Sequence, residues 1–119
     1  MKNRFTTTAV ALALLYAGTT HAFGPGDAER GKMIFNQRCA VCHGEDGRGK
    51  NGMAADFVGE WNRLGKPDAE LARNIRSGYQ TPGKMYTAGS CPAQPFTDRD
   101  MEDVLAHMRT AFGPTARFK

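Results

Sequence analysis

The sequence has few cysteines and no hydrophobic run long enough to cross a membrane. Cysteine occurs three times in 119 residues, which is too rare for a disulfide framework to be the main support of the fold. The longest apolar segment covers only residues 9–17, whereas a transmembrane helix takes about 20 residues. Because a chain of this length builds a modest core, a bound cofactor is the better candidate for the missing support.

A strong charge of either sign is also absent. The formal net charge is +4, and the charged residues are scattered without forming a run. Loss of an N-terminal leader ending at Ala22 would remove Lys2 and Arg4 and lower the net charge to +2. Nucleic-acid binding therefore has no electrostatic signature in this sequence, and most charges are expected to lie on solvated surface.

The N-terminus has the order of a secretory signal. Two basic residues precede the apolar residues 9–17, and small residues lead up to Ala22. We therefore expect a signal peptide at residues 1–22, removed on export to the periplasm, and one domain at residues 23–119. An uncleaved membrane tether is the alternative that the sequence leaves open.

Three helices are expected in this domain, and no strand-like alternation occurs. The predicted helices cover residues 27–41, 68–77 and 97–112, each bounded by a capping or helix-breaking residue. Gly31 falls inside the first of them, where glycine costs about 1 kcal/mol relative to alanine. A close contact with another helix would explain it. The expected fold class is all-α.

Two segments rich in glycine and proline separate the predicted helices. Residues 44–59 contain repeated glycines with charges between them, which indicates a surface loop. Residues 78–96 combine glycines with three prolines, which prevents a regular element. Loops of this length inside a compact domain usually have a function.

The most specific signal is Cys39-x-x-Cys42-His43. C-x-x-C-H is the pattern of covalent c-type haem attachment, in which two thiols add to one porphyrin and the adjacent imidazole reaches the iron. A zinc site would need a second Cys or His pair, which Cys91 and His107 do not make. A redox dithiol would need an α/β context. We expect Cys39 and Cys42 to hold one haem c covalently and His43 to be an axial iron ligand.

The second axial ligand decides whether the iron carries electrons or binds small molecules. Three methionines on the predicted helices are expected to pack in the core, namely Met33, Met101 and Met108. Met53 follows the haem motif closely, an awkward position for reaching the opposite face of the porphyrin. Met85 stands alone in the loop 78–96, which can pass over that face. Met85 is therefore the expected second ligand.

Cys91 belongs to the same loop and leaves several hypotheses open. An unpaired thiol in an exported protein is a buried small hydrophobe, a reactive thiol or half of a disulfide to another chain. Ligation of the iron by its thiolate in place of Met85 is a further alternative.

Two other side chains invite a functional hypothesis. His107 follows the apolar stripe of the last helix, so we expect it to pack rather than to bind metal. Trp61 is expected either to pack against the haem edge or the core, or, together with Arg63, to contact a haem propionate.

Over nearly all of residues 23–119 the sequence resembles the class I monohaem cytochrome c family. Beside the haem motif, the resemblance rests on Gly31, Phe35, Met85 and residues 45–49, 71–78 and 103–109. It implies the cytochrome c fold, in which the first and last helices cross at Gly31 and Met85 is the second axial ligand. Tyr86 departs from this pattern because the family usually has proline after the methionine, and His107 occupies a position that is commonly aromatic.

The sequence therefore predicts a cytochrome c domain of three main helices and long loops around one haem. The expected function is one-electron transfer in the periplasm between a donor and an acceptor that dock transiently near the haem edge, without catalysis of its own. Neither nucleic acid nor a membrane span after signal removal is expected. Two alternatives remain: a haem subunit of a dehydrogenase or oxidase complex linked through Cys91, and a haem enzyme or sensor with an open iron position.

Overall fold

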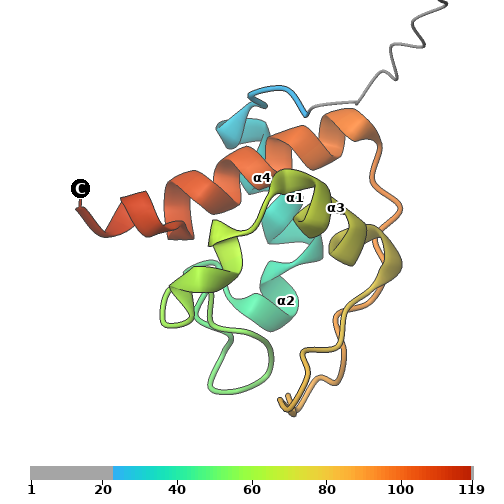
Figure 1. Cartoon of the computed structure of the whole chain (residues 1–119), viewed down its shortest axis with the longest axis vertical. Helices are drawn as coiled ribbons and strands as arrows, with labels where there is room; N and C mark the ends of the chain where they lie inside the picture. The colour runs from blue at the N-terminus through green and yellow to red at the C-terminus, as the bar shows by residue number, and fades with distance from the viewer. Residues whose placement is uncertain (1–22, 119) are drawn as a thin grey trace, which may run out of the picture.

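The computed structural model describes residues 23–118, which form helices joined by long loops (Figure 1). In chain order the elements are α1 (Ala28–Arg38), α2 (Ala40–His43), the 3-10 helix η1 (Trp61–Gly65), α3 (Asp68–Ser77), α4 (Asp98–Phe112) and the 3-10 helix η2 (Pro114–Phe118). These residues contain no strand, only an isolated antiparallel bridge between Tyr79 and Cys91. The all-α prediction is confirmed, and the predicted signal peptide, residues 1–22, lies outside the described residues.

The starts of the first and last helices are set by side-chain caps. The Asp27 carboxylate accepts hydrogen bonds from the backbone N–H groups of Glu29 and Arg30, at 3.0 and 3.1 Å. The Thr97 hydroxyl accepts one from the N–H of Asp100 at 3.1 Å. Each cap satisfies backbone donors that the first turn of a helix leaves free, so both predicted starts are confirmed.

The first predicted helix is wrong at its C-terminal end. Instead of one helix over residues 27–41, α1 ends at Arg38 and α2 begins at Ala40. At Cys39 the backbone φ is −114°, far from the helical value of about −63°, and the chain bends there. Burial of the Ala40 side chain in the core anchors this bend. The bend directs α2 away from the axis of α1.

Helices α1 and α4 cross at Gly31 (Figure 1). A Cβ atom added at Gly31 would overlap the backbone carbonyl of Asp103 and come within 3.0 Å of the His107 Cβ. No residue larger than glycine fits at this contact without a shift of the helices. The close contact expected from the mid-helix glycine is confirmed.

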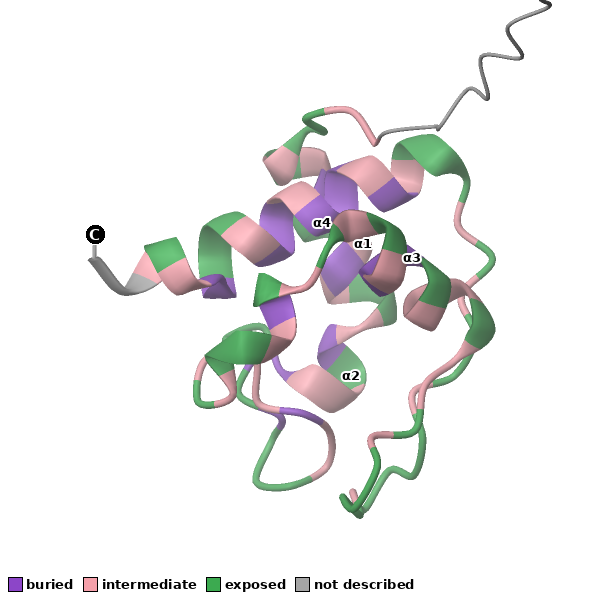
Figure 2. Ribbon diagram, in the orientation of Figure 1, coloured by how far each residue is buried: buried purple, intermediate pink, exposed green. Residues whose placement is uncertain are grey.

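The hydrophobic core lies between these two helices and η1 (Figure 2). Its largest fully buried apolar side chains are Phe35, Leu64, Met101, Val104 and Leu105. Met108 is also buried, so the core positions predicted for Met101 and Met108 are confirmed.

The core position predicted for Met33 is wrong, since its side chain is 60% exposed. Gly31 and Phe35 are buried against α4 and lie four residues apart, on one face of α1. Met33 lies two residues from each of them and therefore falls on the opposite face of the helix.

A buried carboxylate, Asp103, fastens α4 to the start of α1. Its Oδ1 accepts the backbone N–H of Asp27 at 2.7 Å, and its Oδ2 pairs with the guanidinium of Arg30. Arg30 also reaches Asp100 at 2.7 Å. Burial alone would raise the pKa of Asp103, but the bonds from Asp27 and Arg30 outweigh burial and lower it.

Arg109 of α4 holds the connection between η1 and α3. Its guanidinium donates to the Lys66 carbonyl at 2.7 Å and to the Asp68 carboxylate at 2.8 Å. These bonds fix η1 beside the core and define one wall of the site. None of the helices within residues 23–118 is long and apolar enough to cross a membrane.

Candidate functional site

A cavity of about 330 Å³ lies between α2, η1, α3 and the loop that follows α3. Its wall is largely apolar and includes residues from several separate elements, among them Cys39, Cys42, His43, Leu64, Tyr86 and Cys91. The cavity thus brings together three of the four predicted site residues. It is within the size range of pockets that hold small molecules and cofactors.

The imidazole of His43 is held from two sides. Its Nδ1 lies 3.1 Å from the backbone carbonyl of Ala55, and its ring stacks on Phe57 with 4.4 Å between the ring centroids. Because a carbonyl only accepts hydrogen bonds, Nδ1 carries the proton in this contact and the lone pair is on Nε2. Burial lowers the pKa of His43, and the bond to Ala55 opposes that effect without cancelling it. The ring is therefore a neutral imidazole with Nε2 available to a metal.

All three cysteines line the cavity and none is in a disulfide. Burial raises the pKa of Cys39 to about 12 and also raises the pKa of Cys91 above its usual value. Both thiols are therefore neutral at physiological pH. The unpaired thiols of Cys39 and Cys42, together with the imidazole of His43 and its free Nε2, form the donor set that covalent attachment of a c-type haem requires. These residues therefore fit that group.

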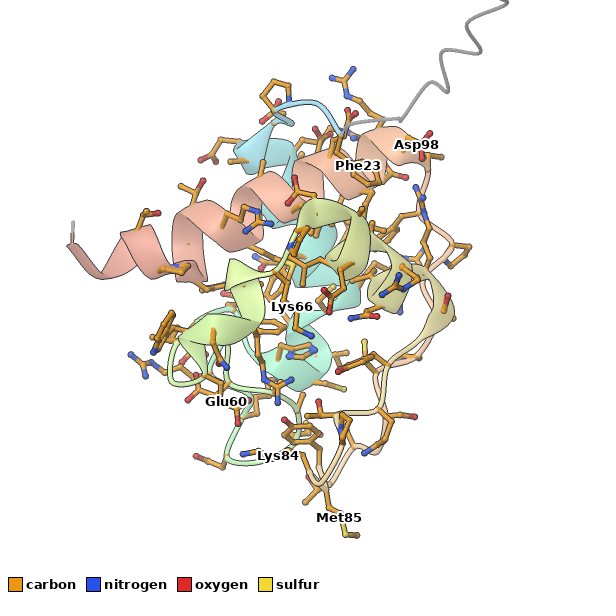
Figure 3. All side chains as sticks on the ribbon, in the orientation of Figure 1. Phe23, Glu60, Lys66, Lys84, Met85 and Asp98 are labelled. Carbon is orange, nitrogen blue, oxygen red and sulfur yellow. The ribbon has the colours of Figure 1, made fainter. Side chains whose placement is uncertain are left out.

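Met85 is the one predicted site residue that does not line the cavity. Its side chain is 98% exposed and points away from the helices at the tip of the loop (Figure 3). Among the methionines in the part of the chain that the structure describes, only Met108 contributes to the cavity wall, and it is buried in the core.

Of the other side chains that the sequence singled out, one lines the cavity and two do not. Arg63 lines the cavity, whereas Trp61 is 48% exposed and does not. His107 lies outside the cavity wall, packed between Phe35 and Phe112 with ring centroids 5.4 Å from each. This packing on α4 was expected. The His107 Nε2 is buried and has no hydrogen-bond partner within residues 23–118.

The sequence argument missed the polar side chains that face Arg63. The Arg63 guanidinium donates to the Thr81 hydroxyl at 2.9 Å and to the Tyr86 hydroxyl at 2.7 Å, and it also pairs with Glu60. Glu60 in turn pairs with Lys84 at 2.9 Å. The only sequence signal for this network was the unusual tyrosine after Met85.

Comparison with known proteins agrees with this geometry. The family described as cytochrome c matches residues 28–112. A curated relative, the "Cbb3-type cytochrome c oxidase subunit FixPc" of Rhizobium leguminosarum bv. viciae, is 42% identical over 59 residues. The match covers 48% of this chain and 21% of that relative, so this chain spans about a fifth of the relative's length.

Proposed function

The chain belongs to the cytochrome c family, and on this basis we propose that it is a one-electron carrier that receives electrons from one redox protein and delivers them to another. Membership implies a covalently bound haem c and a part in haem-based electron transfer. When bound, the haem supplies the one-electron change between ferric and ferrous iron.

The observation that carries this proposal is the joint placement of Cys39, Cys42 and His43 in one apolar cavity. Under the proposal, the two thiols form the covalent links to the cofactor. The Ala55 carbonyl keeps the proton of His43 on Nδ1 and so directs the Nε2 lone pair to the iron. The apolar wall excludes water from the site, and this limits the reorganisation that a change of charge requires.

We propose Met85 as the second axial ligand of the electron-carrying state. The support is its solitary position in a loop that follows α3, within the residues that match the family, and the resemblance noted in the sequence. A His/Met pair serves electron carriage because it raises the reduction potential. Its side chain points outward in the described conformation, so ligation requires the loop tip to turn.

The proposal also covers where the protein acts and how it meets its redox partners. The signal-like order of residues 1–22 favours a periplasmic site of action for residues 23–119. A donor and an acceptor would dock weakly at the mouth of the cavity, as small electron-transfer complexes do.

Absorption spectra of the haem-loaded protein, oxidised and reduced, test the ligand set. We expect a near-infrared sulfur-to-iron band in the oxidised wild type and in the control Met53→Ala, which alters the other loop, and its loss in Met85→Ala. Absence of the band in the wild type, or its survival in Met85→Ala, would overturn the Met85 assignment.

A second candidate function is that of a haem-bearing subunit in a larger redox complex. It is favoured by the relative, whose name describes an oxidase subunit. The half-buried position of Cys91 in the cavity wall does not favour a disulfide to another chain. Size-exclusion chromatography of the native exported protein separates the two, because a subunit elutes with its partners and a carrier elutes alone; reducing and non-reducing gels then show whether a disulfide contributes to the link.

A further inference from the structure

Five polar side chains join η1 to the loop that carries Met85. They are Glu60, Arg63, Thr81, Lys84 and Tyr86, and we call them the polar latch. Within the latch, Lys84 binds Glu60 and Tyr86 binds Arg63, at 2.9 and 2.7 Å. The two neighbours of Met85 in the chain are thus both tied to the same pair of charged residues.

Backbone contacts hold the same loop on both sides of the latch. The N–H groups of Thr87 and Ala88 donate to the carbonyls of Gly52 and Met53 at 3.0 and 3.1 Å. At the base of the loop, Tyr79 and Cys91 exchange two backbone hydrogen bonds of 2.9 Å each. The loop therefore has a defined conformation in which the latch fixes the residues at its tip.

This conformation explains why Met85 points outward. Met85 lies between two hydrogen-bonded turns, one closed by the Lys84 N–H on the Thr81 carbonyl at 3.2 Å and the other by the Gly89 N–H on the Tyr86 carbonyl at 3.0 Å. Because Lys84 and Tyr86 turn toward η1, Met85 between them turns to solvent (Figure 3). Because both chain neighbours of Met85 are tied to η1 and to Glu60 before it, turning Met85 toward the cavity must move the backbone that carries Lys84 and Tyr86 and so disturbs their contacts.

We propose that the polar latch and the approach of Met85 to the haem site are mutually exclusive, which makes Arg63 and Tyr86 positioning residues for the second axial ligand. The inference rests on the proposed function, since it takes Met85 as that ligand. The latched state leaves the second axial position accessible to a small added ligand, and the unlatched state gives it to Met85. Removing a latch contact therefore shifts the equilibrium toward the state in which Met85 is the second axial ligand.

Imidazole binding to the oxidised, haem-loaded protein measures this competition. Imidazole competes with Met85, so its apparent Kd rises as the fraction of latched protein falls. Tyr86→Phe removes one hydrogen bond to a charged group, and we expect it to raise the apparent Kd of imidazole about five- to tenfold. The sulfur-to-iron band should strengthen, or stay at full strength, in the same variant.

The control is Thr110→Val, which also removes one hydroxyl hydrogen bond, the one to the Ala106 carbonyl at 2.8 Å, but on α4 and outside the cavity wall. It should leave imidazole affinity unchanged. In a Met85→Ala background, where no methionine competes, Tyr86→Phe should have no effect. Equal haem content and equal far-ultraviolet circular dichroism establish that all variants are folded.

The outcomes separate the latch from the proposed function. If Met85→Ala tightens imidazole binding but Tyr86→Phe leaves it unchanged or tightens it, the latch is refuted while Met85 stays the ligand. An undiminished effect of Tyr86→Phe in the Met85→Ala background would also refute the latch. If Met85→Ala itself changes neither affinity nor spectrum, Met85 is not the ligand and both proposals fail.

Discussion

At the scale of single residues, two histidines in aromatic surroundings differ in their hydrogen bonds. His43 stacks on Phe57 and has a backbone acceptor for Nδ1. His107 packs between Phe35 and Phe112, and its buried Nε2 has no partner in the part of the chain that the structure describes. The Nδ1 of His43 therefore has a hydrogen-bond partner and its Nε2 is left for the proposed iron, whereas the unpartnered Nε2 of His107 costs free energy in the folded state.

The burial of His107 predicts a pH dependence of stability. Burial, followed by the nearby positive charge of Lys32, lowers the pKa of His107 in the folded chain. The unfolded chain then binds more protons, so stability should fall as the pH drops below about 6.5, the pKa of a free histidine. His107→Phe should reduce the difference in unfolding temperature between pH 7 and pH 5, measured by circular dichroism. An unchanged difference would contradict this role of His107.

Asp103 predicts an acid-sensitive link between the first and last helices. Its lowered pKa means that the stability it contributes is present at neutral pH and is lost as the pH falls through the acidic range. Asp103→Asn keeps an acceptor for the N–H of Asp27 but removes the charge that pairs with Arg30. We expect a loss of about 2 kcal/mol in the free energy of unfolding at pH 7, measured with urea. Equal stability of variant and wild type would contradict a stabilising role for the charge of Asp103.

At the scale of elements, the crossing of α1 and α4 depends on Gly31. Gly31→Ala puts a methyl group into the backbone of Asp103, and overpacking of this kind costs at least about 2 kcal/mol. The matched control is Gly65→Ala in η1, where an added Cβ meets nothing within 4 Å. Urea unfolding should separate the two variants clearly. If Gly31→Ala were as stable as the control, the close contact between α1 and α4 would not be needed for stability and this prediction would be wrong.

The elements themselves were largely predictable because their signals are local. Thr97 and Asp27 cap the helices they precede, and the spacing of glycine and proline marked both long loops. The break at Cys39 had no such signal, because it depends on the burial of Ala40 in the core. The outward position of Met85 was also unpredictable, because the partners of Lys84 and Tyr86 lie more than 20 residues away in sequence.

The site was predictable only where its spacing is short. Residues three and four positions apart lie on one side of a helical turn, so Cys39, the N-cap of α2, lies on the same side as Cys42 and His43, and all three line the cavity. The contact of His43 with Ala55 and the cavity position of Arg63 depend on folded loops. Sequence patterns do not encode such contacts, so the polar latch became visible only in the structure.

At the scale of the whole molecule, the cofactor should act as part of the core. The cavity wall is largely apolar and borders the core at Leu64 and Val104. A chain with Cys39→Ser and Cys42→Ser cannot attach haem covalently, and we expect its unfolding temperature to fall by about 10 °C or more. Cys91→Ser should keep its haem and stay close to the wild type. A double variant as stable as the wild type would exclude a structural role of the haem.

Electron carriage is tested most directly by a redox titration of the haem-loaded wild-type protein, followed by visible absorption at controlled potential. The account predicts one haem per chain, a single transition that fits one electron, and the same spectra in the oxidising and reducing directions. Irreversible spectra, a transition that needs more than one electron, or turnover of peroxide or oxygen under the same conditions would contradict it.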